Sequence, residues 1–188
     1  MNLARCCKSW WYPLLPSVSS PAHGKRRKGL FYRFCPPQVL ECQKEQDRFF
    51  WDRFLKPRKP GTFLELGGDG VTGSHTLGLE LLQRWSGTVF VCGEKAAARA
   101  RKARTCRVMG VDGEMPTASS VDLLAIHRPS DFRGGWDWLT TGEWKPGWVI
   151  VQNREPDPRW CRLLESSGYR LKFFFHDDEY FQLKSRQW

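Results

Sequence analysis

A glycine-rich turn between an apolar run and an amphipathic segment constrains this 188-residue chain more than any other feature. The run over 62–66 is short, apolar and bounded by glycines, which is typical of a buried strand. Gly68, Gly70 and Gly73 then match a G-x-G-x-x-G spacing, and a helix is expected over 74–85. Such glycines let a ligand approach the backbone closely, and the start of a helix favours anionic groups. A dinucleotide-type site in an α/β fold is the first interpretation of this order.

The remainder of the chain repeats the alternation of strand and helix. Further strands are expected at 88–92, 107–111, 121–126 and 147–151, with helices over 39–55, 94–104, 132–140 and 158–167. Two last runs, 169–175 and 179–183, predict an antiparallel hairpin. Alternating strands and helices imply right-handed βαβ units in a mostly parallel sheet. We therefore expect an α/β, three-layer Rossmann-like domain with its ligand at the carboxyl ends of the strands.

The positive charge is unevenly distributed along the chain. Thirty basic and 20 acidic residues give a net charge of +10, yet residues 1–40 hold seven basic residues and no acid. The remaining 23 basic and 20 acidic residues leave only +3 for 41–188. We predict two parts, a basic, proline-broken extension over 1–37, disordered or targeting, and a domain over 38–188. The basic run 25–28 fits a nuclear address, a phosphate-binding patch or a solvated linker. A nucleic-acid partner is not expected for the domain.

The seven cysteines show neither a CxxC pair nor a histidine at zinc spacing. We interpret them as reduced thiols of an intracellular protein without a metal site. The protein is expected to be cytoplasmic, or organellar if 1–37 is a transit peptide. No apolar run is long enough to span a bilayer.

A carboxylate at the end of the first strand argues against a dinucleotide ligand. Glu65 would face the pyrophosphate, and like charges repel strongly at low dielectric. The same group suits a ligand with a cationic head, such as the amino acid end of S-adenosylmethionine. Glu94, after the second strand, can accept hydrogen bonds from ribose hydroxyls, and Asp112 could bond an adenine amino group. In the alternative interpretation, Glu65 only caps a turn and Asp112 lies in an exposed loop.

Two blocks of the sequence resemble the start of the FkbM-type methyltransferases: EQDRFFWDRFL and GTFLELGGDGVTGSHTLGLE. In that family a Gln-Asp-Arg-Phe helix precedes Glu-x-Gly, Asp-Gly-Val and Ser-x-Thr-Leu. The segments VDLLAI, GGWDWL, WVIV and LLESSGYRL resemble later parts of the family in the same order, so the resemblance covers about 45–184. It implies a class I methyltransferase fold, S-adenosylmethionine as cofactor, and O-methylation of a small molecule or glycan.

The resemblance also implies which residues bind the cofactor. The expected set is Glu65, Gly67, Gly68, Asp69, Gly70, Ser74, Glu94 and Asp112. The chain departs from the family after the fourth and fifth strands. There it has Ile126-His127-Arg128 instead of an Ile-Asp-x-Glu-Gly-like turn, and Gln152 instead of a glutamate. Two acids near the expected reaction centre are therefore missing.

His127 is the candidate catalytic residue. Methyl transfer is an in-line displacement, in which alignment matters most and a base takes the proton of the acceptor hydroxyl. A histidine at the end of the fourth strand suits this role, and the alternative is a loop histidine without a catalytic part. His75, where the family usually has Asn, is expected to bond the start of a helix. Two other functions stay open: a degenerate relative that acts as a binding or scaffold module, and a nicotinamide-dependent oxidoreductase supported only by the glycine spacing.

Overall fold

The computed structural model of the chain describes residues 50, 60–110, 121–127, 139, 145–152, 158–175 and 177–185. The predicted extension over 1–37 lies outside these residues, as do Asp112 and most of the predicted helices 39–55 and 132–140. Within those two segments, Phe50 and Leu139 are helical.

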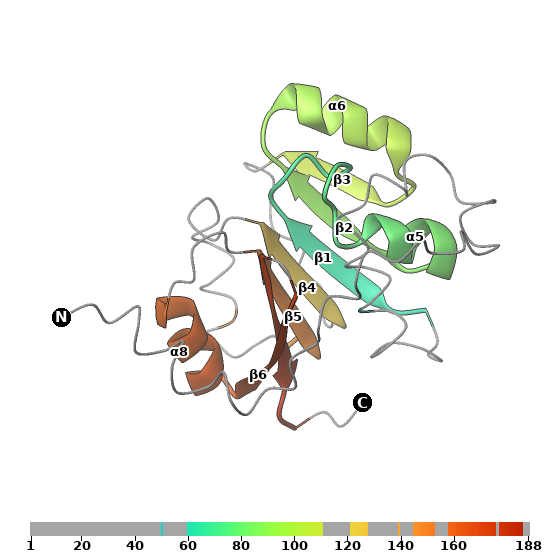
Figure 1. The fold of residues 1–188 in the computed structure, drawn as a ribbon. Coiled ribbons are helices and arrows are strands. Elements are labelled where there is room, and N and C mark those ends of the chain that lie inside the picture. The colour runs from blue at the N-terminus through green and yellow to red at the C-terminus, as the bar shows by residue number, and fades with distance from the viewer. Residues whose placement is uncertain are drawn as a thin grey trace, which may run out of the picture.

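The described strands form one seven-stranded sheet in the order β3-β2-β1-β4-β5-β7-β6. The strands are β1 (Thr62–Leu66), β2 (Ser86–Val91), β3 (Arg107–Gly110), β4 (Leu123–His127), β5 (Trp148–Gln152), β6 (Tyr169–Phe175) and β7 (Asp178–Leu183). The first five strands are parallel, whereas β7 runs antiparallel between β5 and β6. The predicted α/β class, the mostly parallel sheet and the C-terminal antiparallel hairpin are confirmed (Figure 1).

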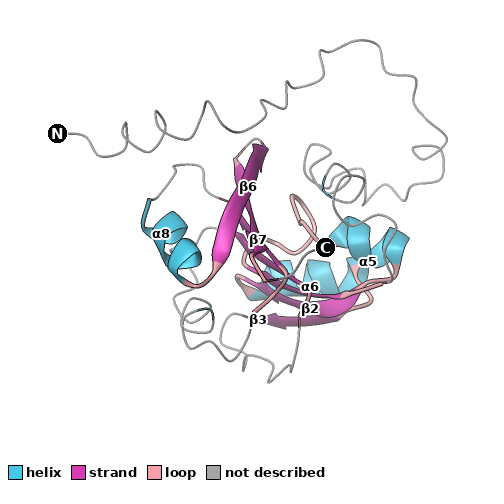
Figure 2. Cartoon of the chain, turned by 90° about the horizontal axis from the view of Figure 1, so that it is seen from below, coloured by secondary structure: helices cyan, strands magenta, loops and turns pink. Residues whose placement is uncertain are grey.

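Three described helices cover the sheet: α5 (Leu77–Gln83), α6 (Glu94–Ala103) and α8 (Pro158–Ser166). Helices α5 and α6 lie on one face and α8 on the other, so the domain has three layers (Figures 1 and 2). Helices α6 and α8 agree with the predicted ranges to within a residue. Helix α5 begins three residues later than predicted, because residues 74–76 turn towards the end of β1.

Alternate residues of the central strands enter two different cores. Phe63 and Ile150 pack with the residues of α5 and α6, whereas Leu64 and Val149 pack with Leu164 of α8. This alternation explains why the strands are apolar throughout, since helices cover both faces of a parallel sheet.

The strand register gathers polar side chains at one edge of the α5–α6 face. Glu65 pairs with Ala125, two residues before His127, and His127 pairs with Gln152. Gln152 in turn pairs with Asp178, the first residue of β7. Paired residues of neighbouring strands point to the same side, as do residues two apart along a strand. Glu65, His127, Gln152 and Asp178 therefore share the face that α5 and α6 cover, at the carboxyl ends of the parallel strands.

Candidate functional site

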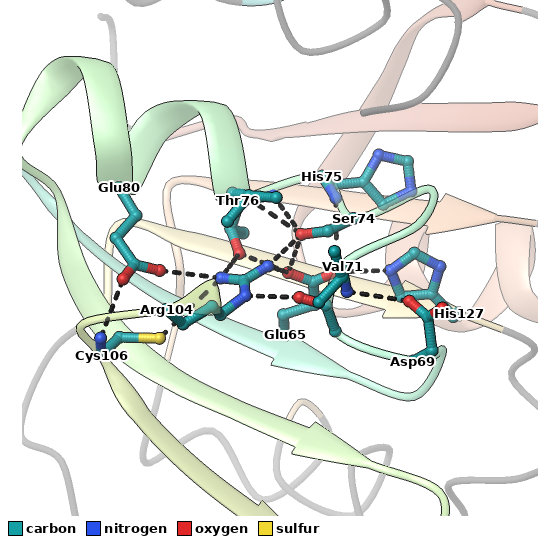
Figure 3. Close-up of polar contacts among 12 residues, drawn as sticks. Glu65, Asp69, Val71, Ser74, His75, Thr76, Glu80, Arg104, Cys106 and His127 are labelled. Atoms are coloured by element: carbon teal, nitrogen blue, oxygen red, sulfur yellow. Dashed lines mark hydrogen bonds and ion pairs between the residues drawn. The ribbon is translucent and has the colours of Figure 1, made fainter. Parts of the chain in front are cut away.

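The carboxylate of Glu65 is the centre of a buried polar network (Figure 3). Five donors converge on it: the Ser74 hydroxyl at 2.8 Å, the Thr76 hydroxyl, the His75 backbone amide at 3.3 Å, the Arg104 guanidinium at 3.0 Å and the His127 ring at 2.7 Å. The Ser74 hydroxyl also accepts a hydrogen bond from the Leu77 amide at the start of α5. Glu65 thus fixes the turn that leads into the helix.

Arg104 supplies the main positive charge of this network. Its side chain is 0% exposed and contacts two buried carboxylates, Glu65 and Glu80, each at 3.0 Å. The guanidinium also donates to the Gly70 carbonyl, and its central carbon lies 6.0 Å from the centre of the Phe63 ring. We name Glu65, Glu80 and Arg104 the closed cluster.

Arg104 is not among the predicted site residues, because it stands among several basic residues of a kind that usually face solvent. A signal was present, because Ala97 and Ala100 are the buried residues of α6. Arg104 follows them at the i, i+3, i+7 spacing of one helix face. That spacing separates it from the exposed Arg99 and Arg101.

The closed cluster keeps its groups charged. Burial alone would raise the pKa of Glu65, but the charge of Arg104 and the bond to His127 outweigh burial and hold the pKa well below its usual range. Burial would likewise lower the pKa of Arg104, but Glu65, Cys106 and Glu80 together outweigh burial and raise the pKa. Removing one partner of such a group would leave an uncompensated buried charge.

His127 is held by oxygen atoms on both sides of its ring. Its Nε2 lies 2.7 Å from Glu65 Oε1, and its Nδ1 lies 2.9 Å from Gln152 Oε1. Two acceptors favour a ring protonated on both nitrogens. Burial would lower the pKa of His127, but the hydrogen bond and charge of Glu65, together with Gln152 and Asp178, outweigh burial and raise the pKa. In this arrangement His127 is a donor, and neither of its nitrogens offers a lone pair to a proton.

His75 is in contact with His127 but differs from it chemically. The two rings stack with their centres 4.7 Å apart and an angle of 22° between the planes. Burial and the neighbouring charge of His127 lower the pKa of His75 to about 3, so the ring is neutral at pH 7. Its Nδ1 lies 3.7 Å from Asp178 Oδ2. That separation would suit an ion pair, but a neutral ring makes the contact a dipolar one.

The residues of the glycine turn divide into two groups. Gly68 is exposed, has a φ of +70°, and a Cβ added to it would lie 3.4 Å from the His127 ring. Gly70 is buried, and an added Cβ would lie 2.8 Å from a Val91 methyl carbon. Asp69 accepts hydrogen bonds from the Val71 and Thr72 amides and contacts Arg99 at 3.2 Å. Gly68 therefore faces the edge of the sheet, whereas the contacts of Gly70 and Asp69 lie within the protein and support the turn.

Glu94 lies at the exposed part of the same edge. It is the first residue of α6, its side chain is 82% exposed, and its carboxylate contacts Arg101 at 2.9 Å. A Cβ added to Gly93 would meet no atom within 4 Å. We name Gly68, Gly93 and Glu94 the open rim, because they leave space next to the carboxyl ends of β1 and β2.

Within the described ranges, no group of three or more His, Cys, Asp or Glu residues could hold a metal ion. In the same part of the chain, no helix is long and apolar enough to cross a membrane. The open rim, in contrast, offers an accessible carboxylate and a glycine backbone, which suit an organic ligand.

No model of a known protein family matches the chain, and no curated protein sequence matches it. Among solved structures, the chain is similar to a methyltransferase from Pyrococcus furiosus, at 18% identity and a TM-score of 0.53, over 73% of this chain and 80% of that one. It is also similar to precorrin-6y C5,15-methyltransferase from Geobacter metallireducens, at 13% identity and a TM-score of 0.53, over 73% and 85% of the two chains. A SAM-dependent methyltransferase from Aquifex aeolicus matches at 14% identity and a TM-score of 0.53, over 79% and 94%. The chain thus has the Rossmann-like fold of the class I methyltransferases.

Proposed function

We propose that this protein is an S-adenosylmethionine-dependent methyltransferase of FkbM type that methylates a hydroxyl group of a small molecule or glycan. The observation that carries the proposal is the open rim, which lies at the carboxyl ends of β1 and β2 in a class I methyltransferase fold. Ligands of open α/β sheets bind at this edge.

The groups of the open rim fit the cofactor. Gly68 lets its methionine part approach the backbone, and the exposed carboxylate of Glu94 can accept hydrogen bonds from the two ribose hydroxyls. Gly67 is buried and donates its amide to the Phe90 carbonyl, so its part is to shape the turn. Glu65 has a supporting role in this proposal, because five donors of the chain already occupy its carboxylate. Its part is to hold the turn that presents Gly68, together with Ser74.

In this proposal, Asp69, Gly70 and Asp112 differ in how they act on the cofactor. Asp69 and Gly70 act on the cofactor through the shape of the turn, since their contacts lie within the protein. Asp112 lies outside the described residues and stays the predicted partner of the adenine.

The bound cofactor supplies an electrophilic methyl group on a sulfonium, and the chain positions the acceptor oxygen in line with it. His127 stays the candidate catalytic residue at the end of β4. A role as base requires one of its two hydrogen bonds to open, because both ring nitrogens face oxygen atoms.

Calorimetric titration of the full chain with S-adenosylmethionine tests the proposal. We expect binding, and we expect Glu94→Ala to weaken it by about tenfold or more, the cost of losing hydrogen bonds to a charged group. Glu165→Ala is the matched control, because Glu165 is an exposed glutamate on α8, across the sheet. Absence of binding, or undiminished binding by Glu94→Ala, would overturn the cofactor assignment. Preferential binding of a nicotinamide cofactor would favour an oxidoreductase instead.

A second function, a catalytically degenerate binding or scaffold module, is favoured by one observation. His127 and Gln152 stand at strand ends where the resemblance predicts acids, and they bond each other. Cofactor binding without formation of S-adenosylhomocysteine, over a panel of hydroxyl-bearing acceptors, would favour this function over methyl transfer.

A further inference from the structure

His75 differs from every other member of the buried polar network. Its side chain is 1% exposed, yet neither ring nitrogen has a hydrogen-bond partner among the described residues. A buried polar group without a partner loses its hydrogen bonds to water and gains none in return, which destabilises the fold. His127, in contact with it, has partners on both nitrogens. A ring of this kind can obtain its missing hydrogen bond from a bound ligand.

The position of His75 suits contact with a methyl acceptor. It lies in the turn between β1 and α5, and its ring stacks on His127 at the carboxyl end of β4. Its Nδ1 lies 3.7 Å from Asp178, which belongs to the strand that pairs with β5. The ring is therefore next to His127, which is also the residue that a Cβ on Gly68 would approach.

Three charged groups face the ring, and their effects oppose one another. The cationic His127 disfavours a proton on His75, as does burial, whereas Glu65 favours one. Asp178 lies 3.7 Å from Nδ1 and would stabilise a positive charge formed there. Before reaction the ring is neutral and retains a lone pair, which His127 lacks.

We propose that His75 is the catalytic base of the methyl transfer and that Asp178 is its positioning residue. This inference depends on the proposed function. Nδ1–H points towards Asp178, and Nε2 accepts the proton of the acceptor hydroxyl. The oxygen–methyl bond forms as the sulfur–methyl bond breaks, so the sulfonium becomes a neutral thioether and the hydroxyl proton moves to Nε2. The imidazolium that results is stabilised by Asp178 and later loses its proton to water.

A weakly basic ring is sufficient for this step. The hydroxyl proton becomes strongly acidic once the oxygen begins to form a third bond, so the transfer is downhill even to a poor base. The neutral ring also avoids repulsion of a cationic cofactor, which a second imidazolium beside His127 would cause.

Nitrogen NMR of the full chain without ligand tests the state of the ring. The sequence contains four histidines, so His23→Asn and His176→Asn assign the signals of two of them, and His127→Asn separates the last two. At pH 7 we expect His75 to be protonated on Nδ1 alone and His127 on both nitrogens. Asp178→Asn should redistribute the His75 proton between Nδ1 and Nε2. Protonation of His75 on both nitrogens, or on Nε2 in the unaltered protein, would overturn the proposal.

A second measurement tests the contact with an acceptor. With S-adenosylhomocysteine bound, catechol and glycerol serve as hydroxyl probes, and we expect at least one to shift the His75 Nε2 resonance. For that probe, His75→Gln should lower kcat by about 10²–10⁴-fold, typical of a lost general base, with cofactor affinity within twofold. Absence of a shift with both probes, or an unchanged kcat, would overturn the role as base. Failure of the cofactor to bind would instead overturn the proposed function. The protonation state of His75 would still be known in that case, because its NMR measurement needs no ligand.

Discussion

The closed cluster and the open rim lie at the same edge of the sheet, but their carboxylates differ in burial and in the number of groups that bind them. Glu65, near the end of β1, is fully buried and bound by five donors of the chain. Glu94, after the end of β2, is 82% exposed, and its contact among the described residues is an exposed arginine. Two acids near the ends of successive strands, which look equivalent in the sequence, therefore have different uses. The first holds the glycine turn, and the second is available to a ligand.

Arg104 is the physical cause of this difference. A carboxylate without a cation would be costly to bury, and Arg104 compensates both Glu65 and Glu80. In the described part of the chain, no buried cation contacts Glu94, whose partner Arg101 is half exposed. Substitutions of Arg104 and Arg101 should therefore have different effects on the free energy of unfolding.

The largest effect is expected from Arg104→Met. The substitution leaves two buried carboxylates without their cation, and breaking such a group costs about 3–5 kcal/mol. Urea unfolding at pH 7 measures the loss. Arg101→Met is the matched control and should cost less than about 1 kcal/mol, because its ion pair is exposed and screened. Equal losses in the two variants would remove the distinction between the closed cluster and the open rim.

The second effect concerns pH and His75. The folded-state pKa of His75 is about 3, below its ordinary value of 6.5. As the pH falls below 6.5, the unfolded chain binds a proton that the folded chain does not. The free energy of unfolding should then decrease by about 1.4 kcal/mol per pH unit, down to about pH 3.

His75→Asn removes this dependence, so a comparison with the unaltered protein isolates it. Between pH 6.5 and pH 5 the unaltered protein should lose about 2 kcal/mol more than the variant, from the slope above. The lowered pKa of Glu65 also reduces stability in acid, but only at lower pH and in both proteins. Parallel unfolding curves for the two proteins across this range would contradict a neutral buried His75.

The third prediction tests whether the open rim binds the cofactor, and its expected effect on stability is smaller. Gly68 and Gly168 both have a positive φ, +70° and +95°, so an alanine at either position should cost about 1–2 kcal/mol in backbone strain. Only Gly68→Ala places a methyl group at the open rim, near His127. We expect it alone to weaken S-adenosylmethionine binding, by about tenfold, as measured by calorimetry. An equal loss of binding in Gly168→Ala would show that the effect is one of general stability.

Local patterns explain which parts of the fold the sequence predicts. Apolar runs and the glycine turn each act within a few residues, and those of the predicted strands and helices that the structure describes lie close to their predicted ranges. The late start of α5 is an exception with a long-range cause, because Ser74 and Thr76 bond Glu65 instead of continuing the helix. The insertion of β7 between β5 and β6 is a second feature with a long-range cause, because strand order depends on pairing between distant segments.

By itself, the sequence determined the α/β class and the turn that follows β1, and it predicted Glu94 as a contact of the cofactor. Only the tertiary structure decided that Glu94 is exposed, that Arg104 is buried among carboxylates, and that His75 contacts both His127 and Asp178. The physical reason is that hydrogen-bond geometry and burial, which determine what a charged or titratable group does, depend on strand register and on neighbours far away in the chain. Residue type and spacing carry the local part of that information, and the contacts across the sheet carry the remainder.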